Sequence, residues 1–274
     1  MSFRRSAVAA ASVIGIAGAM LTAVPVVAAA DSDVPTSRII GGSATTTSEW
    51  TGIAALLQRG RGGRWGQVCG GTLVAPQYVV TAAHCVVDTR ARDMNVVLGR
   101  PRISGADGER IGVRKIIMGK YKPKTSKNDI ALLRLSTASI QEVMPVLTKR
   151  DRWAYKAGID AQVAGWGATK PSGWGGSEVL RQADVNVVGT RKCKKLFRPI
   201  YGKKQICAGL WAKGGRDSCN GDSGGPLTVM APDGRRILAG IVSFGAIRCA
   251  SKRAPVSVYT RTAAYHKWIK RRIN

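Results

Sequence analysis

Gly221-Asp222-Ser223-Gly224-Gly225-Pro226 places one serine in a glycine-rich turn of this 274-residue chain. Upstream, Thr81-Ala82-Ala83-His84-Cys85 supplies a histidine, and Asn128-Asp129-Ile130-Ala131-Leu132 supplies a carboxylate. A serine is a poor nucleophile until a neighbouring imidazole takes its proton. A buried carboxylate can hold that imidazole in one tautomer. The three stretches therefore predict side chains that meet in the folded chain and act together.

Each motif alone has an ordinary structural explanation: a packed histidine, an aspartate capping a strand, or a simple turn. Three such motifs in the order His, Asp, Ser are not expected by chance. Together they make the sequence resemble the trypsin-like (chymotrypsin-fold) serine proteases, especially secreted bacterial members, from Ile39 to about Ile273. The resemblance implies a serine endopeptidase with His84 as general base, Asp129 as its orienting carboxylate and Ser223 as nucleophile.

Short β-branched runs between glycines and prolines predict strands. They lie at 96–98, 111–117, 130–135, 161–164, 185–188 and 238–244. Helix-like spacing appears only at the end, at Tyr265, Trp268 and Ile269 and on to Arg272. The pattern predicts an all-β chain with a C-terminal α-helix. The resemblance implies two packed antiparallel six-stranded β-barrels, at 39–145 with His84 and Asp129, and at 146–274 with Ser223 and the helix.

The N-terminal stretch decides the compartment. Residues 1–30 hold two early arginines, a long apolar run and a closing run of small residues, which is typical of a secretory signal peptide. A membrane anchor is the alternative, but the run is rich in Ala and Gly and precedes a polar segment. No later run approaches the ~18 apolar residues of a membrane span. We expect a soluble protein outside the cell.

Six cysteines, an even number, are expected to form disulfides in that oxidising compartment. Zinc is the competing interpretation, but the chain has no CxxC pair and only two histidines, His84 and His266. Six cysteines leave about 15 pairings open. The resemblance implies the pairs Cys69–Cys85, Cys193–Cys207 and Cys219–Cys249.

The resemblance also implies a zymogen. Ile39-Ile40-Gly41-Gly42 looks like the new N-terminus of a protease cut after Arg38, so residues 31–38 would be a pro-segment. The freed ammonium of Ile39 would then pair with Asp222. That ion pair would stabilise the loop conformation in which the N–H groups of Gly221 and Ser223 form the oxyanion hole.

The resemblance places Asp217 at the base of the specificity pocket, which implies cleavage after Lys or Arg, as would occur at Arg38 itself. Ser243-Phe244-Gly245 would receive the substrate backbone, with Ser243 also supporting Asp129. Phe244 stands where Trp is usual. Ser257 replaces a pocket-wall glycine, which would favour Lys over the bulkier Arg, and a one-residue insertion puts Arg248 near the rim. An altered preference for the residue before the cut is therefore the alternative.

The chain has 43 Lys and Arg against 16 Asp and Glu, a net charge of +27. Residues 1–38 hold three arginines and two aspartates, so the chain from Ile39 carries +26. Basic clusters lie at 59–64, 120–127, 191–195 and 267–272. The electrostatic field of so large a positive charge predicts non-specific attachment to anionic polymers. The alternative is that the basic residues form a solvated surface that keeps the protein soluble. Specific nucleic-acid recognition is not expected, because the clusters lack interleaved aromatics.

The remaining expectations concern partners and cofactors. Acyl transfer needs no cofactor, and no metal is expected because residues 98–101 lack the acidic ligand of the calcium loop in animal trypsins. The expected partners are protein or peptide substrates and protein protease inhibitors, and the expected state is a monomer. A cationic binding protein on an inactive protease scaffold is the alternative from a different functional class.

Overall fold

The structure, a computed structural model, describes residues 39–274. The signal peptide expected at 1–30 and the pro-segment expected at 31–38, with Arg38, lie outside the described residues. The strands are β1 (Ser43–Ala44), β2 (Ile53–Arg59), β3 (Trp65–Ala75), β4 (Tyr78–Thr81), β5 (Met94–Leu98), β6 (Glu109–Met118), β7 (Ala131–Leu135), β8 (Asp160–Gly165), β9 (Arg181–Val188), β10 (Gln205–Gly209), β11 (Pro226–Met230), β12 (Arg236–Phe244) and β13 (Val256–Arg261). The helices are α1 (Thr190–Leu196), α2 (Thr262–Ile273) and the 3₁₀ turns η1 (Ala83–Cys85), η2 (Ala91–Asp93), η3 (Pro123–Thr125) and η4 (Arg152–Tyr155).

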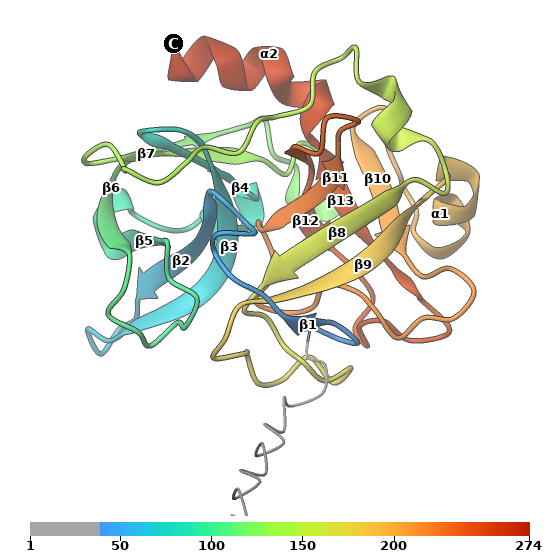
Figure 1. The fold of residues 1–274 in the computed structure, drawn as a ribbon, viewed down its shortest axis with the longest axis horizontal. Coiled ribbons are helices and arrows are strands. Elements are labelled where there is room, and N and C mark those ends of the chain that lie inside the picture. Colours follow the sequence, from blue (N-terminus) through green and yellow to red (C-terminus); the bar gives the residue numbers. More distant parts are fainter. Residues whose placement is uncertain (1–38) are drawn as a thin grey trace, which may run out of the picture. The chain divides into compact units, whose positions relative to one another are not determined.

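The first half of the chain forms a closed antiparallel barrel in the order β2-β3-β4-β7-β6-β5 (Figure 1). Several of its strands carry β-branched residues and leucine, which suit a pleated surface buried on one face. In β7, Leu132, Leu133 and Leu135 are fully buried. A barrel of six strands leaves an interior that these side chains fill.

The second half forms the sheet β1-β9-β10-β13-β12-β11-β8, and pairing of β8 with β9 closes six of these strands into a second barrel. The seventh strand, β1, precedes the first barrel in sequence but pairs with β9 through Ser43 opposite Gln182. The segment after Ile39 is therefore anchored on the barrel that carries Ser223.

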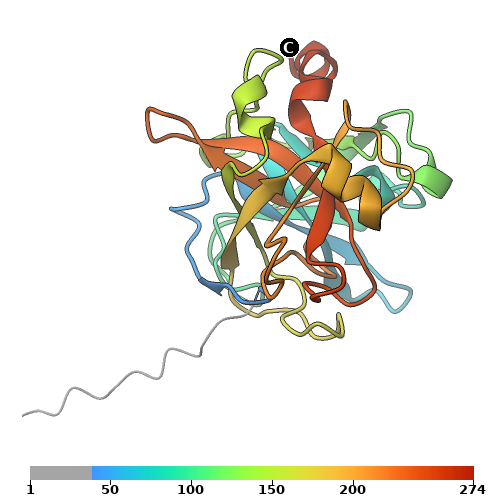
Figure 2. The same ribbon diagram turned by 90° about the vertical axis from the view of Figure 1, so that its right-hand side faces the viewer.

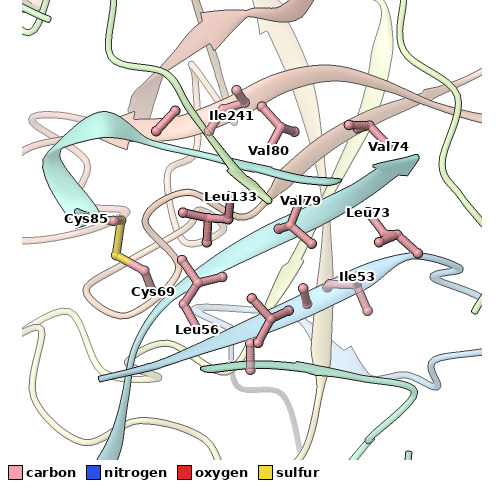
Figure 3. Packing of buried hydrophobic residues seen from close by; sticks show 14 of the residues in the cluster. Ile53, Leu56, Cys69, Leu73, Val74, Val79, Val80, Cys85, Leu133 and Ile241 are labelled. Atoms are coloured by element: carbon pink, nitrogen blue, oxygen red, sulfur yellow. A yellow bond between two sulfur atoms is a disulfide. The ribbon is translucent and has the colours of Figure 1, made fainter. Parts of the chain in front are cut away.

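The apolar core of the first barrel extends onto the second barrel, which also has a core of its own around Val163, Leu227 and Tyr259. Leu56, Leu73, Val80 and Leu133 of the first barrel pack in the same cluster as Ile241 of β12 (Figure 3). Figures 1 and 2 show α2 at one end of the barrels, and its buried residues Tyr265 and Ile269 belong to the same cluster. This continuous packing brings the ends of β4, β7 and β12 together between the barrels.

The predicted fold class is confirmed: the described residues form two closed six-stranded antiparallel barrels and a C-terminal helix. All six predicted runs coincide with strands, and the predicted helix with α2. Sequence patterns missed the other seven strands of the described residues (β1, β2, β3, β4, β10, β11 and β13) and the short α1. Glycines interrupt the alternation in β3, and the Ala-Leu-rich run of β2 fits a helix as well as a strand. None of the helices within residues 39–274 is long and apolar enough to cross a membrane.

Candidate active site

His84 lies in the 3₁₀ turn η1, directly after β4. Its neighbours Ala83 and Cys85 are buried, and the disulfide between Cys69 and Cys85 ties the turn to β3. The imidazole itself is partly exposed. The sequence around His84 therefore fixes its backbone in the core and leaves its ring partly exposed.

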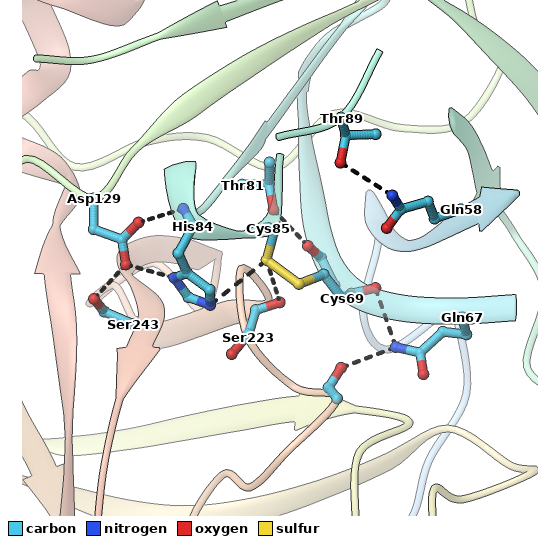
Figure 4. Close-up of a disulfide and its surroundings, with 12 residues drawn as sticks. Gln58, Gln67, Cys69, Thr81, His84, Cys85, Thr89, Asp129, Ser223 and Ser243 are labelled. Atoms are coloured by element: carbon cyan, nitrogen blue, oxygen red, sulfur yellow. Dashed lines mark hydrogen bonds and ion pairs between the residues drawn. A yellow bond between two sulfur atoms is a disulfide. The ribbon is translucent and has the colours of Figure 1, made fainter. Parts of the chain in front are cut away.

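Asp129 is fully buried, immediately before β7. Its Oδ2 lies 2.8 Å from His84 Nδ1, and its Oδ1 accepts the His84 backbone N–H at 2.9 Å. Ser243 Oγ donates to the same Oδ2 at 2.6 Å (Figure 4). An ionised carboxylate that receives these donors holds the imidazole in the tautomer that leaves Nε2 free to take a proton.

Ser223 lies in a tight turn between two glycines with positive φ, Gly221 at 93° and Gly224 at 79°. A Cβ at Gly224 would overlap Thr81 Oγ1 and the Gly70 carbonyl oxygen, so only glycine fits. The Gly70 N–H donates to the Ser223 carbonyl at 2.7 Å, which docks the serine turn onto β3.

The serine and the histidine meet at the disulfide. Cys85 Sγ lies 3.8 Å from His84 Nε2 and 3.6 Å from the Ser223 carbonyl oxygen. Figure 4 shows Ser223 beside the imidazole, on the side away from Asp129. Ser223 Oγ makes no hydrogen bond to His84 in the described chain, and such bonds often tighten only when substrate is bound. The three predicted side chains thus lie in one row.

The N–H groups of Gly221 and Ser223, predicted to form the oxyanion hole, have no acceptor within residues 39–274. The Gly221 carbonyl, in contrast, accepts from Gln67 Nε2 at 2.9 Å. Sequence analysis missed Gln67, which lies on β3, 154 positions from the residue it holds. It also missed Thr260, whose Oγ1 donates to the Asp129 carbonyl at 2.8 Å. No local pattern marks either contact.

The predicted substrate strand forms the end of β12, where Ser243, Phe244 and Gly245 border a pocket of about 290 Å³ next to Ser223. A Cβ at Gly245 would lie 2.7 Å from Ser257 Oγ, so glycine keeps the pocket mouth open. Phe244 packs edge-on against Phe197, with ring centroids 5.7 Å apart.

Ser257 lies between this pocket and the predicted base residue Asp217. Ser257 lines the pocket and donates to Asp217 Oδ2 at 2.7 Å, whereas Asp217 is buried and is absent from the lining. Asp217 Oδ1 accepts the Ser218 N–H at 2.8 Å. Burial raises the pKa of Asp217 to about 7, against the opposing effect of these hydrogen bonds.

Ile39 and Asp222, the predicted activation pair, are both buried. Asp222 accepts the N–H of Gly167 at 2.8 Å and that of Cys219 at 2.9 Å. In the part of the chain that the structure describes, no cation pairs with Asp222. Burial raises the pKa of its carboxyl to about 6.

The cysteines form the three pairs that the resemblance implies: Cys69–Cys85, Cys193–Cys207 and Cys219–Cys249. The last joins Cys219, four residues before Ser223, to Cys249, and both cysteines line the pocket next to Ser223. Cys69, Cys85 and His84 also cluster within reach of a single ion. Both sulfurs belong to the disulfide, however, and offer no thiolate to a metal.

Comparison with known proteins gives one family and several relatives. The family model described as Trypsin matches residues 39–269. Trypsin eta of Drosophila erecta is 36% identical over 249 residues, which cover 87% of this chain and 91% of that protein. Trypsin eta of Drosophila melanogaster is 37% identical over 85% of this chain and 87% of its own length. Serine protease 56 of Homo sapiens is 35% identical over 86% of this chain and 39% of that protein. These relatives are animal proteins, so the bacterial part of the resemblance stays a prediction.

Proposed function

Because the chain belongs to the trypsin family of serine proteases, and is thus a trypsin-like serine endopeptidase, we propose that it is secreted, activated by a cut after Arg38, and cleaves after lysine or arginine. The observation that carries the catalytic assignment is the imidazole of His84, held by buried Asp129 beside the glycine-bounded turn of Ser223. Secretion rests on the composition of residues 1–30.

In the proposed mechanism Ser223 Oγ attacks the carbonyl carbon of the peptide bond while His84 Nε2 takes its proton. The N–H groups of Gly221 and Ser223 receive the negative charge on the substrate oxygen. The C–N bond then breaks, and the imidazolium gives its proton to the leaving amine. Water, deprotonated by His84, attacks the acyl-enzyme and releases the acid, which restores Ser223. Asp129 remains ionised throughout and stabilises the imidazolium.

The pocket chemistry supports a small basic side chain before the cut. The proposed Asp217 carboxylate lies behind Ser257 Oγ, so a substrate cation would reach it only by way of that hydroxyl. A lysine ammonium is a compact donor that can hydrogen-bond to Ser257 Oγ and be attracted electrostatically by the Asp217 carboxylate behind it. An arginine guanidinium needs a wider, bidentate partner. We therefore propose that lysine is preferred over arginine.

The test uses the chain beginning at Ile39 and peptides that differ only in having Lys, Arg, Phe or Ala before the cut. Turnover after Lys or Arg, absent from a Ser223→Ala control, supports the proposal. Turnover only after Phe or Ala would keep the family mechanism and overturn the specificity. No turnover by folded protein with a free Ile39 would favour a cationic binding protein on an inactive scaffold.

Ser257→Gly is expected to raise cleavage after arginine relative to lysine. The substitution removes the hydroxymethyl group that separates the pocket from Asp217. Steric differences of this size in a pocket are worth about tenfold or more in relative kcat/KM. The measurement is the Arg-to-Lys ratio of kcat/KM for matched peptides. An unchanged ratio, in a variant that still cleaves after lysine, would show that Ser257 does not limit the pocket.

Lysine preference is expected to increase with pH. Below pH 7 the buried Asp217 carboxyl, with its pKa raised to about 7, is largely protonated in the free enzyme and does not attract a cation. The ratio of kcat/KM for a Lys peptide to that for a Met peptide should therefore rise about tenfold between about pH 6 and pH 8, following the ionised fraction. Using a ratio cancels the shared titration of the catalytic groups. In Asp217→Asn the Lys-to-Met ratio should no longer change with pH. A ratio that is independent of pH in the unsubstituted enzyme would contradict the role of Asp217 as the charged group of the pocket.

A further inference from the structure

A cavity of about 350 Å³ lies between η4 and the start of α2, away from the pocket at Ser223. Figures 1 and 2 both show the yellow-green turn of η4 beside the first turn of α2. Five cationic residues line the cavity, together with Thr148, Tyr155, Ala263 and Ala264: Lys149, Arg152, Lys203, Lys204 and Arg261. No Asp or Glu is among the residues of the described chain that line it.

These five cations come from three separate segments and fall outside all four basic clusters of the sequence. Elsewhere in residues 39–274, carboxylates neutralise several arginines: Arg59 pairs with Asp93, Arg216 with Asp184 and Arg235 with Asp233. None of the five cavity cations has such a pair within the described residues. Their combined charge is therefore left for a ligand.

Arg261 is held rigidly in the wall of this cavity. Its Nη1 donates to the Gly202 carbonyl at 2.7 Å, and its guanidinium carbon lies 3.9 Å from the centroid of the Tyr155 ring. Tyr155 is itself fixed, because its hydroxyl donates to the Ala239 carbonyl at 2.8 Å. Partial burial lowers the pKa of Arg261, and the charge of Arg152 lowers it further. The like charges thus repel one another in the free protein, and an anion between them would relieve the repulsion.

Neighbouring groups leave the cavity positive. Asp151 is next to Arg152 in sequence, and its Oδ2 accepts both the N–H and the hydroxyl of Thr148, at 2.7 and 2.8 Å, so this one carboxylate offsets only one of the five positive charges. The first turn of α2 contains no acidic residue, its Ala263 N–H donates to the Tyr155 hydroxyl at 3.2 Å, and its residues Ala263 and Ala264 line the cavity. The positive end of the helix dipole adds to the field of the five cations.

We propose that this cavity binds a ligand that carries two or more adjacent phosphate or sulfate groups. Five cations exceed the charge of a single such group, and the volume lies in the range of pockets for small organic ligands. Lysine and arginine donors suit the tetrahedral oxygens of these groups. The site is distinct from a diffuse attraction of polymers to the +26 surface, because it is a discrete cavity with a single occupant.

The experiment measures binding by titration calorimetry to the full chain carrying Ser223→Ala, which prevents self-digestion. The probes are inorganic tripolyphosphate, a persulfated disaccharide and orthophosphate. We expect one molecule of tripolyphosphate or of the sulfated sugar per chain, bound at least about tenfold more tightly than orthophosphate and more weakly at high salt. The tighter of the two multivalent probes identifies the source of the ligand.

The decisive comparison uses matched triple variants. Lys149→Gln, Arg152→Gln and Lys203→Gln remove three cavity cations that make no side-chain hydrogen bond in the described chain. The control, Arg64→Gln, Lys115→Gln and Lys170→Gln, removes the same charge at exposed positions outside the cavity. An ion pair at a partly exposed site contributes up to about fivefold in affinity, so the cavity variant should bind at least about tenfold more weakly and the control nearly normally.

Equal weakening in both variants would overturn the proposal, because it would show attraction by net charge alone. Several equivalent probe molecules per chain would overturn it as well. Unchanged circular dichroism and unchanged cleavage by the same triple variant with Ser223 restored would show that the fold and the proposed active site are intact. Failure of cleavage in all proteins would count against the proposed function and leave the anion-binding result interpretable.

Discussion

Replacing Ser223 by alanine in the chain that begins at Ile39 should lower kcat for peptide cleavage by about a million-fold. The substitution removes the proposed nucleophilic hydroxyl, on the side of the His84 imidazole away from Asp129 (Figure 4). The proposed oxyanion donors and the proposed substrate strand stay in place, so KM should change little. The measurement is single-turnover cleavage of a Lys peptide, with residual activity compared with the uncatalysed rate.

Ser48→Ala, at an exposed serine far along the chain from the site, is the matched control and should retain full activity. His84→Ala should cost about as much as Ser223→Ala, and the double variant little more, because the two residues act as one unit. Additive losses, or retention of more than about 1% of kcat in Ser223→Ala, would contradict the assignment of the nucleophile.

The second large effect concerns activation: cutting after Arg38 should raise kcat/KM about ten-thousand-fold. The loop between Gly221 and Ser223 contains the buried Asp222, whose pKa burial raises to about 6. At neutral pH in the uncut chain this carboxylate is ionised without a compensating charge, which destabilises the loop. A free ammonium at Ile39 would supply the missing charge. Each oxyanion-hole donor contributes about 2.7 to 4 kcal/mol of transition-state stabilisation, and this loop carries both proposed donors, the N–H groups of Gly221 and Ser223.

Asp222→Asn tests the same argument in the cut chain, since the amide keeps the shape but cannot attract the ammonium. We expect it to lose most of the gain from cleavage, and Arg38→Gln to resist cleavage and remain inactive. The measurements are kcat/KM before and after a limited cut verified by N-terminal sequencing. Full activity of the uncut chain would rule out the zymogen proposal.

The strands and the site were predictable to different degrees. β5, β6 and β12 have β-branched runs that match a strand locally, and they were found. β3 was missed because its glycines serve tertiary contacts: a Cβ at Gly70 would lie 2.9 Å from Gly225 Cα, where the serine turn docks. A residue chosen for close approach to a distant segment carries no local strand signal.

The amino-acid sequence by itself determined the family and the fold: the histidine, aspartate and serine motifs and the even set of cysteines carry the resemblance, and the resemblance implied the two barrels. Short-range patterns suffice there, because each motif shapes its own turn. Only the tertiary structure decided that Gln67 supports Gly221, that Ser257 covers Asp217, and that five cations from three segments surround one cavity. Those contacts join residues tens of positions apart. Their distances depend on how the two barrels pack, and no local run of residues records that packing.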